Sequence, residues 1–337
     1  MRSPQRGSAV STSLGPAIDF LTRTRRFVIT AHETPDGDAI GSECAMQRGL
    51  AALGKEAIIL NADPTPYKFS YLAPGDTIRV LEREGSVPPD LEEYSLLILD
   101  TNDLRNIGQV AAAVLPRVRE HFIIDHHEHD RADVLAGNVI QKGASSTCEI
   151  IYQVLREMNV SVDLPIAEAL YSGIVYDTGC FIYPKTTALT FEIARDLVRA
   201  GVNPNYVYTR IYESNSTASL VLESLVLATL ELRCANRVAI LTMDRKMLLD
   251  SKADYEESDQ LINIPLKSED IRVSVFFKEN VQGLVRCSMR SKGAIDVAQI
   301  AQRFGGGGHK TAAGFKCRDS IDTTKERILE QLRTYFP

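Results

Sequence analysis

The sequence predicts an α/β fold in which an N-terminal doubly wound domain with a parallel sheet is joined by a helical linker to a smaller α+β domain. Short apolar runs alternate with amphipathic segments of helix length through the first half, a rhythm that is typical of βαβ units. The length of 337 residues also exceeds what one hydrophobic core commonly supports, so two cores are expected.

Four apolar runs in the first half are predicted strands, at residues 27–32, 57–60, 95–100 and 121–125. Each run is continuously apolar, as in parallel strands that are buried on both faces. The segment after the first run carries apolar residues at helical spacing, and later patterns predict helices at 146–158, 164–176 and 187–200. Strands that alternate with helices in this way predict a doubly wound parallel sheet.

The domain boundaries follow from shifts in composition. Residues 1–16 are rich in Ser, Gly, Pro and Arg and are expected to form a mobile tail. The N-terminal domain is expected at 17–202, a helical linker with inserted Ser, Thr and Asn at 203–231, and the C-terminal domain at 232–337. The last domain has alternating patterns that predict strands at 237–243, 271–277 and 283–289, with helices at 295–303 and 322–335.

Composition excludes several classes of protein. No window approaches the roughly 18 apolar residues that a membrane span needs, so no membrane partner is expected. A net charge of −6 disfavours binding of long duplex nucleic acid. The six cysteines form no CxxC pair, and the N-terminal segment lacks the apolar stretch of a secretory signal, so reduced thiols in a cytoplasm are expected. The sequence leaves the oligomeric state open, a homodimer included.

The segment HETPDGD directly follows the first predicted strand, where open α/β sheets present their active sites. Pro35 and Gly37 interrupt regular structure, so the loop can direct His32, Asp36 and Asp38 to a common point. The competing interpretation is structural, with Asp38 capping the next helix and Asp36 in a turn.

More ligand-type side chains follow the next predicted strands. One strand ends in Asp100, the next ends in Asp125, His126 and His127, and Asp177 ends an apolar helical run. Each has a structural alternative: Asp100 as the first residue of a turn, His127 as a surface side chain, Asp177 as a helix end. Because all of these segments meet at one edge of the predicted sheet, convergence on a single site is the better interpretation.

Several carboxylates that point into one site require divalent cations, because unit charges ~4 Å apart repel by about 4 kcal/mol at an effective dielectric of ~20. Mixed oxygen and imidazole ligands favour Mn²⁺, with Mg²⁺, Co²⁺ or Zn²⁺ as alternatives, and the lack of nearby cysteine argues against a thiolate zinc site. Two such metals, about 3.5 to 4 Å apart, are the usual apparatus for attack of water on phosphorus.

The motifs AHETPDGDAIGS, ILDTND, IDHH and VYDTGCF resemble the successive motifs of the DHH phosphoesterase superfamily. The later stretch VRCSMRSKGAIDVAQIAQRFGGGGHKTAAGF resembles the DHHA1 domain. The pair resembles the NrnA-type enzymes, which degrade nano-oligoribonucleotides and dephosphorylate pAp. This resemblance implies that the N-terminal domain is catalytic and that the C-terminal domain binds substrate.

The resemblance implies that His32 and Asp36 bind one metal and that Asp100 bridges it to a second metal. The second metal has three further ligands: Asp38, His126 and Asp177. His127 would contact the substrate phosphate, and Asp125 would lie behind the ligands and orient a histidine. The catalytic set is therefore Asp100, Asp125, His126 and His127. Tyr176 stands where the family pattern has Thr, which we expect to matter little because the ligand itself is present.

In the C-terminal domain the run Gly305 to Gly308 can let the backbone approach a phosphate closely. The residues expected to bind substrate there are Ser288, Arg290, Gly306, Gly307, Gly308, His309 and Lys310. Without the resemblance, a flexible connector is the favoured interpretation of the four glycines.

The expected activity is hydrolysis of short oligonucleotides, such as pApA, to 5′-mononucleotides, dephosphorylation of pAp to AMP, or both. The alternatives are a cyclic dinucleotide phosphodiesterase and, from another class, a nucleotide-binding sensor without turnover. An intact ligand set argues against the sensor. The sequence does not rank these substrates or short DNA, and it does not specify cleavage polarity or the physiological metal.

Overall fold

The computed structural model describes residues 14–75, 77–81, 87–127, 137–293 and 295–336, which form two compact units, Met1–Ser214 and Asn215–Pro337. Most of the predicted tail, residues 1–13, lies outside the described residues, and the first helix begins at Gly15. No helix in the described part of the chain is both long and apolar enough to cross a membrane.

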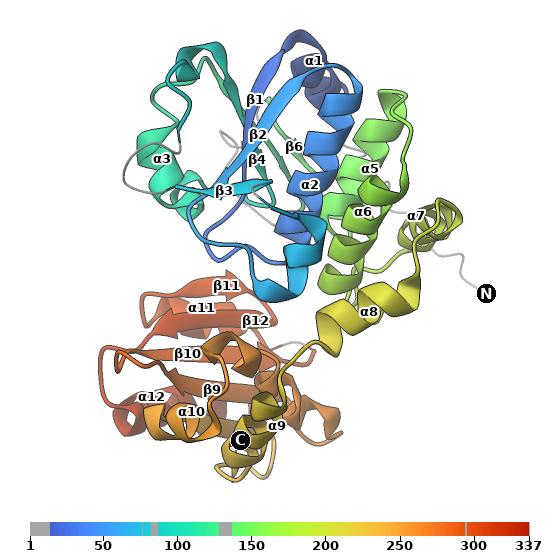
Figure 1. Cartoon of the computed structure of the whole chain (residues 1–337). Helices are drawn as coiled ribbons and strands as arrows, with labels where there is room; N and C mark the ends of the chain where they lie inside the picture. Colours follow the sequence, from blue (N-terminus) through green and yellow to red (C-terminus); the bar gives the residue numbers. More distant parts are fainter. Residues whose placement is uncertain (1–13, 76, 82–86, 128–136, 294, 337) are drawn as a thin grey trace, which may run out of the picture. The chain divides into compact units, whose positions relative to one another are not determined.

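The first unit consists of a parallel sheet with helices around it (Figure 1). Its strands are β1 Arg26–Thr30, β2 Glu56–Asn61, β3 Ile78–Val80, β4 Ser95–Leu99, β5 His121–Asp125 and β6 Val139–Ile140. Its described α-helices are α1 Gly15–Arg23, α2 Gly37–Ala52, α3 Gln109–Ala113, α5 Thr147–Glu157, α6 Leu164–Asp177, α7 Ala188–Arg199 and α8 Pro204–Tyr212.

The strand order β3-β2-β1-β4-β5-β6 confirms the predicted doubly wound fold. All pairs in this sheet are parallel. From β1 the chain continues outward to β2 and β3, and it then returns to β4 and continues outward on the other side to β5 and β6. The connections therefore leave the neighbouring strands β1 and β4 in opposite directions. That reversal opens a crevice at the carboxyl ends of β1 and β4, where ligands of such sheets bind.

Both faces of this sheet are covered, as the continuous apolar runs predict. Phe27 and Ile29 lie in a core with residues of α1, α2, α5 and α6, whereas Val28 lies in a second core with Val110 of α3. Figure 1 shows α2, α5 and α6 on one face and α3 on the other. Each fully buried large side chain contributes about 1.5 to 3 kcal/mol to folding, so the two-sided core holds the strand ends in place.

The second unit contains a mostly antiparallel sheet of order β11-β12-β10-β9-β8-β7, in which only β8 and β9 are parallel. Its strands are β7 Glu231–Arg233, β8 Val238–Met243, β9 Val273–Glu279, β10 Val285–Ser291, β11 Gly307–His309 and β12 Ala312–Lys316. Its α-helices are α9 Thr217–Leu227, α10 Arg245–Ser251, α11 Val297–Gln302 and α12 Ile321–Arg333. This is the smaller α+β fold that the sequence predicts.

The prediction that the strands of this sheet alternate between buried and exposed residues is wrong for β8 and β9. In β9 the first six residues are all buried, and in β8 only one residue is not, whereas β10 does alternate. The cause is a second layer of helices. Val275 packs in a core with α11 and α12, and its neighbour Phe276 packs on the other face against α9 and α10.

Candidate active site

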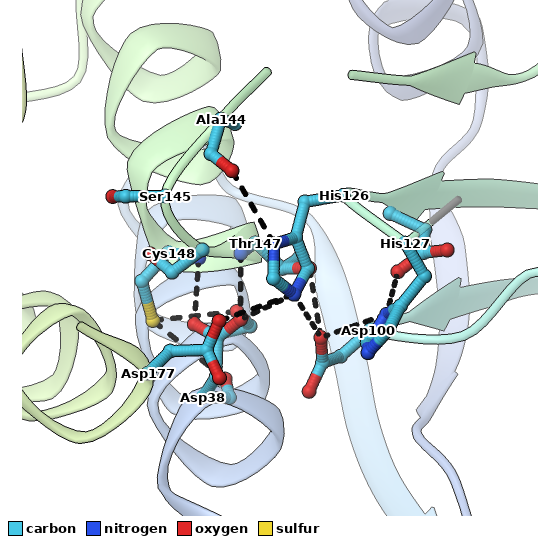
Figure 2. Close-up of polar contacts among 12 residues, drawn as sticks. Asp38, Asp100, His126, His127, Ala144, Ser145, Thr147, Cys148 and Asp177 are labelled. Carbon is cyan, nitrogen blue, oxygen red and sulfur yellow. Dashed lines mark hydrogen bonds and ion pairs between the residues drawn. The ribbon is translucent and has the colours of Figure 1, made fainter. Parts of the chain in front are cut away.

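The predicted ligand residues of the first unit gather at the crevice between β1 and β4. His32, Asp36 and Asp38 follow β1, Asp100 follows β4, and the Asp125 to His127 segment ends β5. Asp177 reaches the same place as the last residue of α6. Figure 2 shows Asp38, Asp100, His126 and Asp177 pointing toward one another.

The segment after β1 forms this part of the site by starting a helix. Asp36 is the N-cap of α2, and its side chain accepts hydrogen bonds from the backbone N–H groups of Asp38 and Ala39, at 2.9 and 3.2 Å. The structural alternative, in which Asp38 caps this helix, is therefore wrong. Asp38 instead lies in the first turn, fully buried, with its carboxylate directed into the site.

Asp38 is held by the N-terminus of another helix, α5. The backbone N–H groups of Thr147 and Cys148 donate to its two carboxylate oxygens at 2.6 and 2.9 Å. A helix N-terminus favours a negative charge because its first N–H groups have no partner within the helix. Gly173 of α6 leaves the necessary room, since a Cβ there would lie 2.9 Å from Asp38 Oδ1 and 2.3 Å from the Cys148 sulfur.

Asp100 has an unusual backbone conformation at the end of β4. Its φ is 60°, in the left-handed region that Asp and Asn tolerate better than most residues. Its N–H still continues the ladder to the Ile124 carbonyl at 3.1 Å, and the Thr147 hydroxyl donates to its Oδ1 at 3.0 Å. The turn therefore lets the strand end while its carboxylate faces the site.

Two histidines face these carboxylates through the same ring nitrogen. Nδ1 of His32 lies 2.8 Å from the Glu33 carbonyl, and Nδ1 of His126 lies 3.4 Å from the Ala144 carbonyl. A carbonyl can only accept, so each Nδ1 carries a hydrogen and Nε2 is the ring nitrogen that is directed toward the carboxylates. Such a backbone contact is what commonly orients a metal-binding imidazole.

Nε2 of His126 lies close to three carboxylates, and Nε2 of His32 lies close to one. For His126 the distances are 3.3 Å to Asp177, 3.6 Å to Asp100 and 3.8 Å to Asp38, and His32 lies 3.5 Å from Asp100. Burial, followed by the charge of His127, lowers the pKa of His126 to about 3. A neutral His126 cannot compensate the carboxylates, and it is the form that binds a metal.

The pKa values of the carboxylates show how strongly this arrangement needs positive charge. Burial, followed by the neighbouring carboxylates, raises the pKa of Asp38, Asp100 and Asp177, the last two to well above the usual range. Among the described residues, no lysine or arginine forms an ion pair with any of them. The charges of His127 and Lys185 lower the pKa of Asp177 but do not outweigh burial and the neighbouring carboxylates, so the group has the character of a donor set for a divalent cation.

Three groups of side chains offer ligand atoms within 4.8 Å of one another, and each could hold a metal. The first is His32, Asp36 and Asp100, and the second is Asp38, His126 and Asp177. A third consists of Asp100, Asp125, His126 and His127. Asp100 lies in the first group and within 3.6 Å of His126 in the second. The residues present thus fit divalent cations, and Asp100 lies close to both of the first two groups.

A second chain of contacts positions His127. Its Nδ1 lies 2.7 Å from Asp125 Oδ1, and Asn102 donates to the other oxygen of Asp125 at 2.6 Å and to the His127 carbonyl at 3.2 Å. Burial lowers the pKa of His127, but the hydrogen bond and charge of Asp125 outweigh it, so the pKa is raised. For Asp125, burial raises the pKa and the contact with His127 more than reverses this.

The sequence reasoning missed Asn102, Ser146, Thr147 and Cys148. Ser146 caps α5 by accepting from the Glu149 N–H, and so it aims the helix at Asp38. The pattern Ser-x-x-Glu at 146–149 is a recognised start of a helix and could have located this N-terminus. Asn102 had no comparable pattern around it.

In the second unit the residues predicted to bind substrate lie on β10, on β11 and directly beside β11, and β12 pairs with both of these strands. Ser288 and Arg290 are two residues apart on β10, and Arg290 pairs with Ala312 of β12. The last two glycines of the run begin β11, which ends at His309, and Lys310 follows it. Gly307 and Gly308 therefore belong to a strand, whereas Gly305 and Gly306 lie between α11 and that strand. A Cβ at Gly306 would lie 2.2 Å from the Gly314 carbonyl, so a larger residue does not fit there.

Comparison with known proteins places both units. The family model for the DHH family, N-terminal domain, matches residues 26–174, and the model for the DHHA1 domain matches residues 236–336. A Thermus thermophilus protein named bifunctional oligoribonuclease and PAP phosphatase NrnA is 29% identical over 313 residues, which cover 90% of this chain and 88% of that protein. Its Bacillus subtilis namesake is 27% identical over 312 residues, with 91% and 93% covered. The crystal structure of an exopolyphosphatase-related protein from Bacteroides fragilis has a TM-score of 0.89 at 24% identity and covers 96% of this chain and 97% of its own, a likeness of fold.

Proposed function

The chain belongs to the DHH phosphoesterases that carry a DHHA1 domain, and from this premise we propose that it hydrolyses short oligonucleotides to 5′-mononucleotides and dephosphorylates pAp to AMP. The observation that carries the proposal is the meeting of two ligand groups at Asp100. The names of the Thermus and Bacillus relatives support the substrate class.

The six predicted ligands, His32, Asp36, Asp38, Asp100, His126 and Asp177, are the proposed metal-binding residues. Two bound cations would supply an activated water and would neutralise charge on the phosphoryl oxygens. Mn²⁺ is the proposed ion because carboxylates and imidazoles are mixed and no thiolate takes part. The chain's own part is to hold these groups, through the α5 N-terminus at Asp38 and the Thr147 hydroxyl at Asp100.

His127 is the proposed phosphate-binding residue of the first unit. Its Nδ1 lies against Asp125, which orients the ring, and a protonated imidazole is a donor suited to a phosphate oxygen. The raised pKa favours that protonated form. Asp125 and Asn102 are positioning residues in this proposal, because they act through His127.

The residues proposed to recognise the rest of the substrate are those of the second unit, Ser288, Arg290, Gly306, Gly307, Gly308, His309 and Lys310. The packing of Gly306 and Gly308 supports this role, since a Cβ would lie 2.2 Å from the Gly314 carbonyl at the first and 2.5 Å from the Ala312 carbonyl at the second. The proposal includes a cytoplasmic location, which the six free cysteines support.

The test is incubation of the purified protein with Mn²⁺ and either pAp or a labelled pApA, with products separated by chromatography. We expect AMP from both, metal-dependent turnover, and loss of turnover in Asp100→Asn. Asp19→Asn is the matched control, because Asp19 is exposed on α1, outside the site. Tight binding of both compounds without product would overturn the proposal in favour of a sensor, and turnover of cyclic dinucleotides alone would favour a cyclic dinucleotide phosphodiesterase.

A further inference from the structure

The second unit has a basic hollow that is separate in the sheet from the glycine strand β11. Its volume is about 430 Å³, and it is lined by Cys234, Ala235, Arg237, Arg272, Tyr335 and Phe336. This size is within the range of roughly 300 to 1,000 Å³ that is usual for small-molecule sites. Arg237 precedes β8, and the sheet order places β8 four strands from β11.

The two arginines bring uncompensated positive charge to this hollow. Both side chains are exposed, and no described residue makes a hydrogen bond or ion pair with either guanidinium. They are neighbours because β8 and β9 are parallel: Val238 pairs with Val273, and the Arg272 N–H donates to the Arg237 carbonyl at 2.8 Å. Among the residues that the structure describes, no aspartate or glutamate lines the hollow. Two adjacent guanidinium groups without a carboxylate are suited to phosphate oxygens.

The aromatic residues supply a different kind of surface. Tyr335 is 43% exposed just after α12, whereas Phe336 is partly buried against the core of the unit. On the other side the chain turns through Cys234, Ala235 and Asn236, which all have positive φ, an uncommon conformation for residues other than glycine and asparagine. An exposed ring beside paired cations matches the way nucleic-acid sites combine stacking with phosphate contacts.

We propose that this hollow binds one nucleotide unit, with its phosphate on Arg237 and Arg272 and its base against Tyr335. The nucleotide is either a free mononucleotide or a distal unit of an oligonucleotide whose first phosphate is bound near Arg290 and Lys310. The second source rests on the proposed function, because it requires an oligonucleotide substrate.

The register of the sheet supports the second source. Arg290 of β10 pairs with Ser274 of β9, and Ser274 is two residues after Arg272, so the two arginines lie at the same end of these strands. Lys310 lies shortly before β12, at that end as well. Basic residues therefore occur at one end of the strands β12, β10, β9 and β8. At ~4.8 Å between strands this row extends over about 14 Å, a length that suits a few nucleotides of single strand.

The first experiment measures binding of 5′-AMP to the full chain in the presence of a chelator, where the acidic cluster repels the ligand. The variant Arg237→Gln/Arg272→Gln should bind AMP roughly tenfold more weakly, because two phosphate contacts are lost. The control Arg245→Gln/Arg318→Gln removes the same charge from exposed positions of the same unit and should bind as the wild type does. Tyr335→Leu should also weaken binding. If it does not, the hollow is a phosphate site and the nucleotide assignment is overturned.

The second experiment separates the two sources by comparing kcat/KM for a dinucleotide and a pentanucleotide with Mn²⁺. If the hollow binds a distal unit of an oligonucleotide, the Arg237→Gln/Arg272→Gln variant should lose about tenfold in kcat/KM for the pentanucleotide, mainly through a higher KM. Its kcat/KM for the dinucleotide should change less than about twofold. If the hollow binds a free mononucleotide, the variant should bind AMP more weakly, and its kcat/KM should be unchanged for both oligonucleotides. AMP binding and pentanucleotide turnover equal to those of the control variant would overturn the proposal. If the wild type hydrolyses neither oligonucleotide, the proposed function is wrong, and the AMP-binding experiment still shows whether the hollow binds a nucleotide.

Discussion

Replacing Asp100 by Asn should raise the stability of the metal-free protein while it removes metal binding and activity. Asn tolerates the left-handed backbone at φ 60°, and its oxygen can still accept from the Thr147 hydroxyl. The fold around residue 100 is therefore retained, and only the charge is lost. Any change in stability then reports the electrostatics of the site.

The magnitude follows from the contacts of Asp100. It is buried beside Asp36, Asp38 and Asp177, whose charges raise its pKa well above the usual range after burial itself. Like charges ~4 to 5 Å apart cost about 3 to 4 kcal/mol each at an effective dielectric of ~20, and uptake of a proton relieves most of this cost. We expect a net gain of about 1 to 3 kcal/mol in the free energy of unfolding in chelator, or roughly 3 to 9 °C in Tm.

The assay is thermal unfolding in EDTA and then in Mn²⁺, at pH 7, with kcat/KM measured in parallel. The wild type should gain stability from Mn²⁺ because the metal binds only the folded state. Asp100→Asn should gain much less and should lose at least about a thousandfold in kcat/KM. Asp19→Asn should match the wild type throughout. A variant that is less stable than the wild type in EDTA and responds equally to Mn²⁺ would refute the reasoning.

Three further predictions test the groups that hold the site. Thr147→Val removes the hydroxyl that donates to Asp100 and should weaken Mn²⁺ binding about tenfold in a metal titration; unchanged affinity would show that the hydroxyl is dispensable. Asp125→Asn should lower the pKa of His127, so the fall in kcat/KM as pH rises through that pKa should move to lower pH, and an unmoved pH profile would contradict the role of Asp125. Gly173→Ala places a Cβ 2.3 Å from the Cys148 sulfur and should cost about 2 kcal/mol or more by chemical denaturation, whereas Gly143→Ala, with open space around it, should cost less than about 1 kcal/mol.

The architecture of the first unit could be predicted because its signals are local. Continuously apolar runs such as 95–100 identify buried parallel strands, and polar residues that follow them must meet at one edge of the sheet. His32, Asp100 and His126 were therefore identifiable before the structure, although the distances between them were not.

The missed features depend on contacts between distant segments. Nothing near Asp38 in the sequence indicates that the N–H groups of Thr147 and Cys148, more than 100 residues later, bind its carboxylate. Likewise, the double burial of β9 depends on helices α9 and α10 that pack on the second face, and no pattern within VSVFFKE specifies that layer. The structural alternative placed the N-cap of α2 at Asp38, whereas the N-cap is Asp36. This difference of two residues is the usual uncertainty of a predicted helix boundary.

The most direct test of the central claim is anomalous diffraction at the manganese edge from crystals of the full chain soaked in Mn²⁺. Two peaks about 3.5 to 4 Å apart are expected, one beside His32 and Asp36 and one beside Asp38, His126 and Asp177, with Asp100 in contact with both. A single peak, or two peaks of which one lies away from Asp100, would contradict the account.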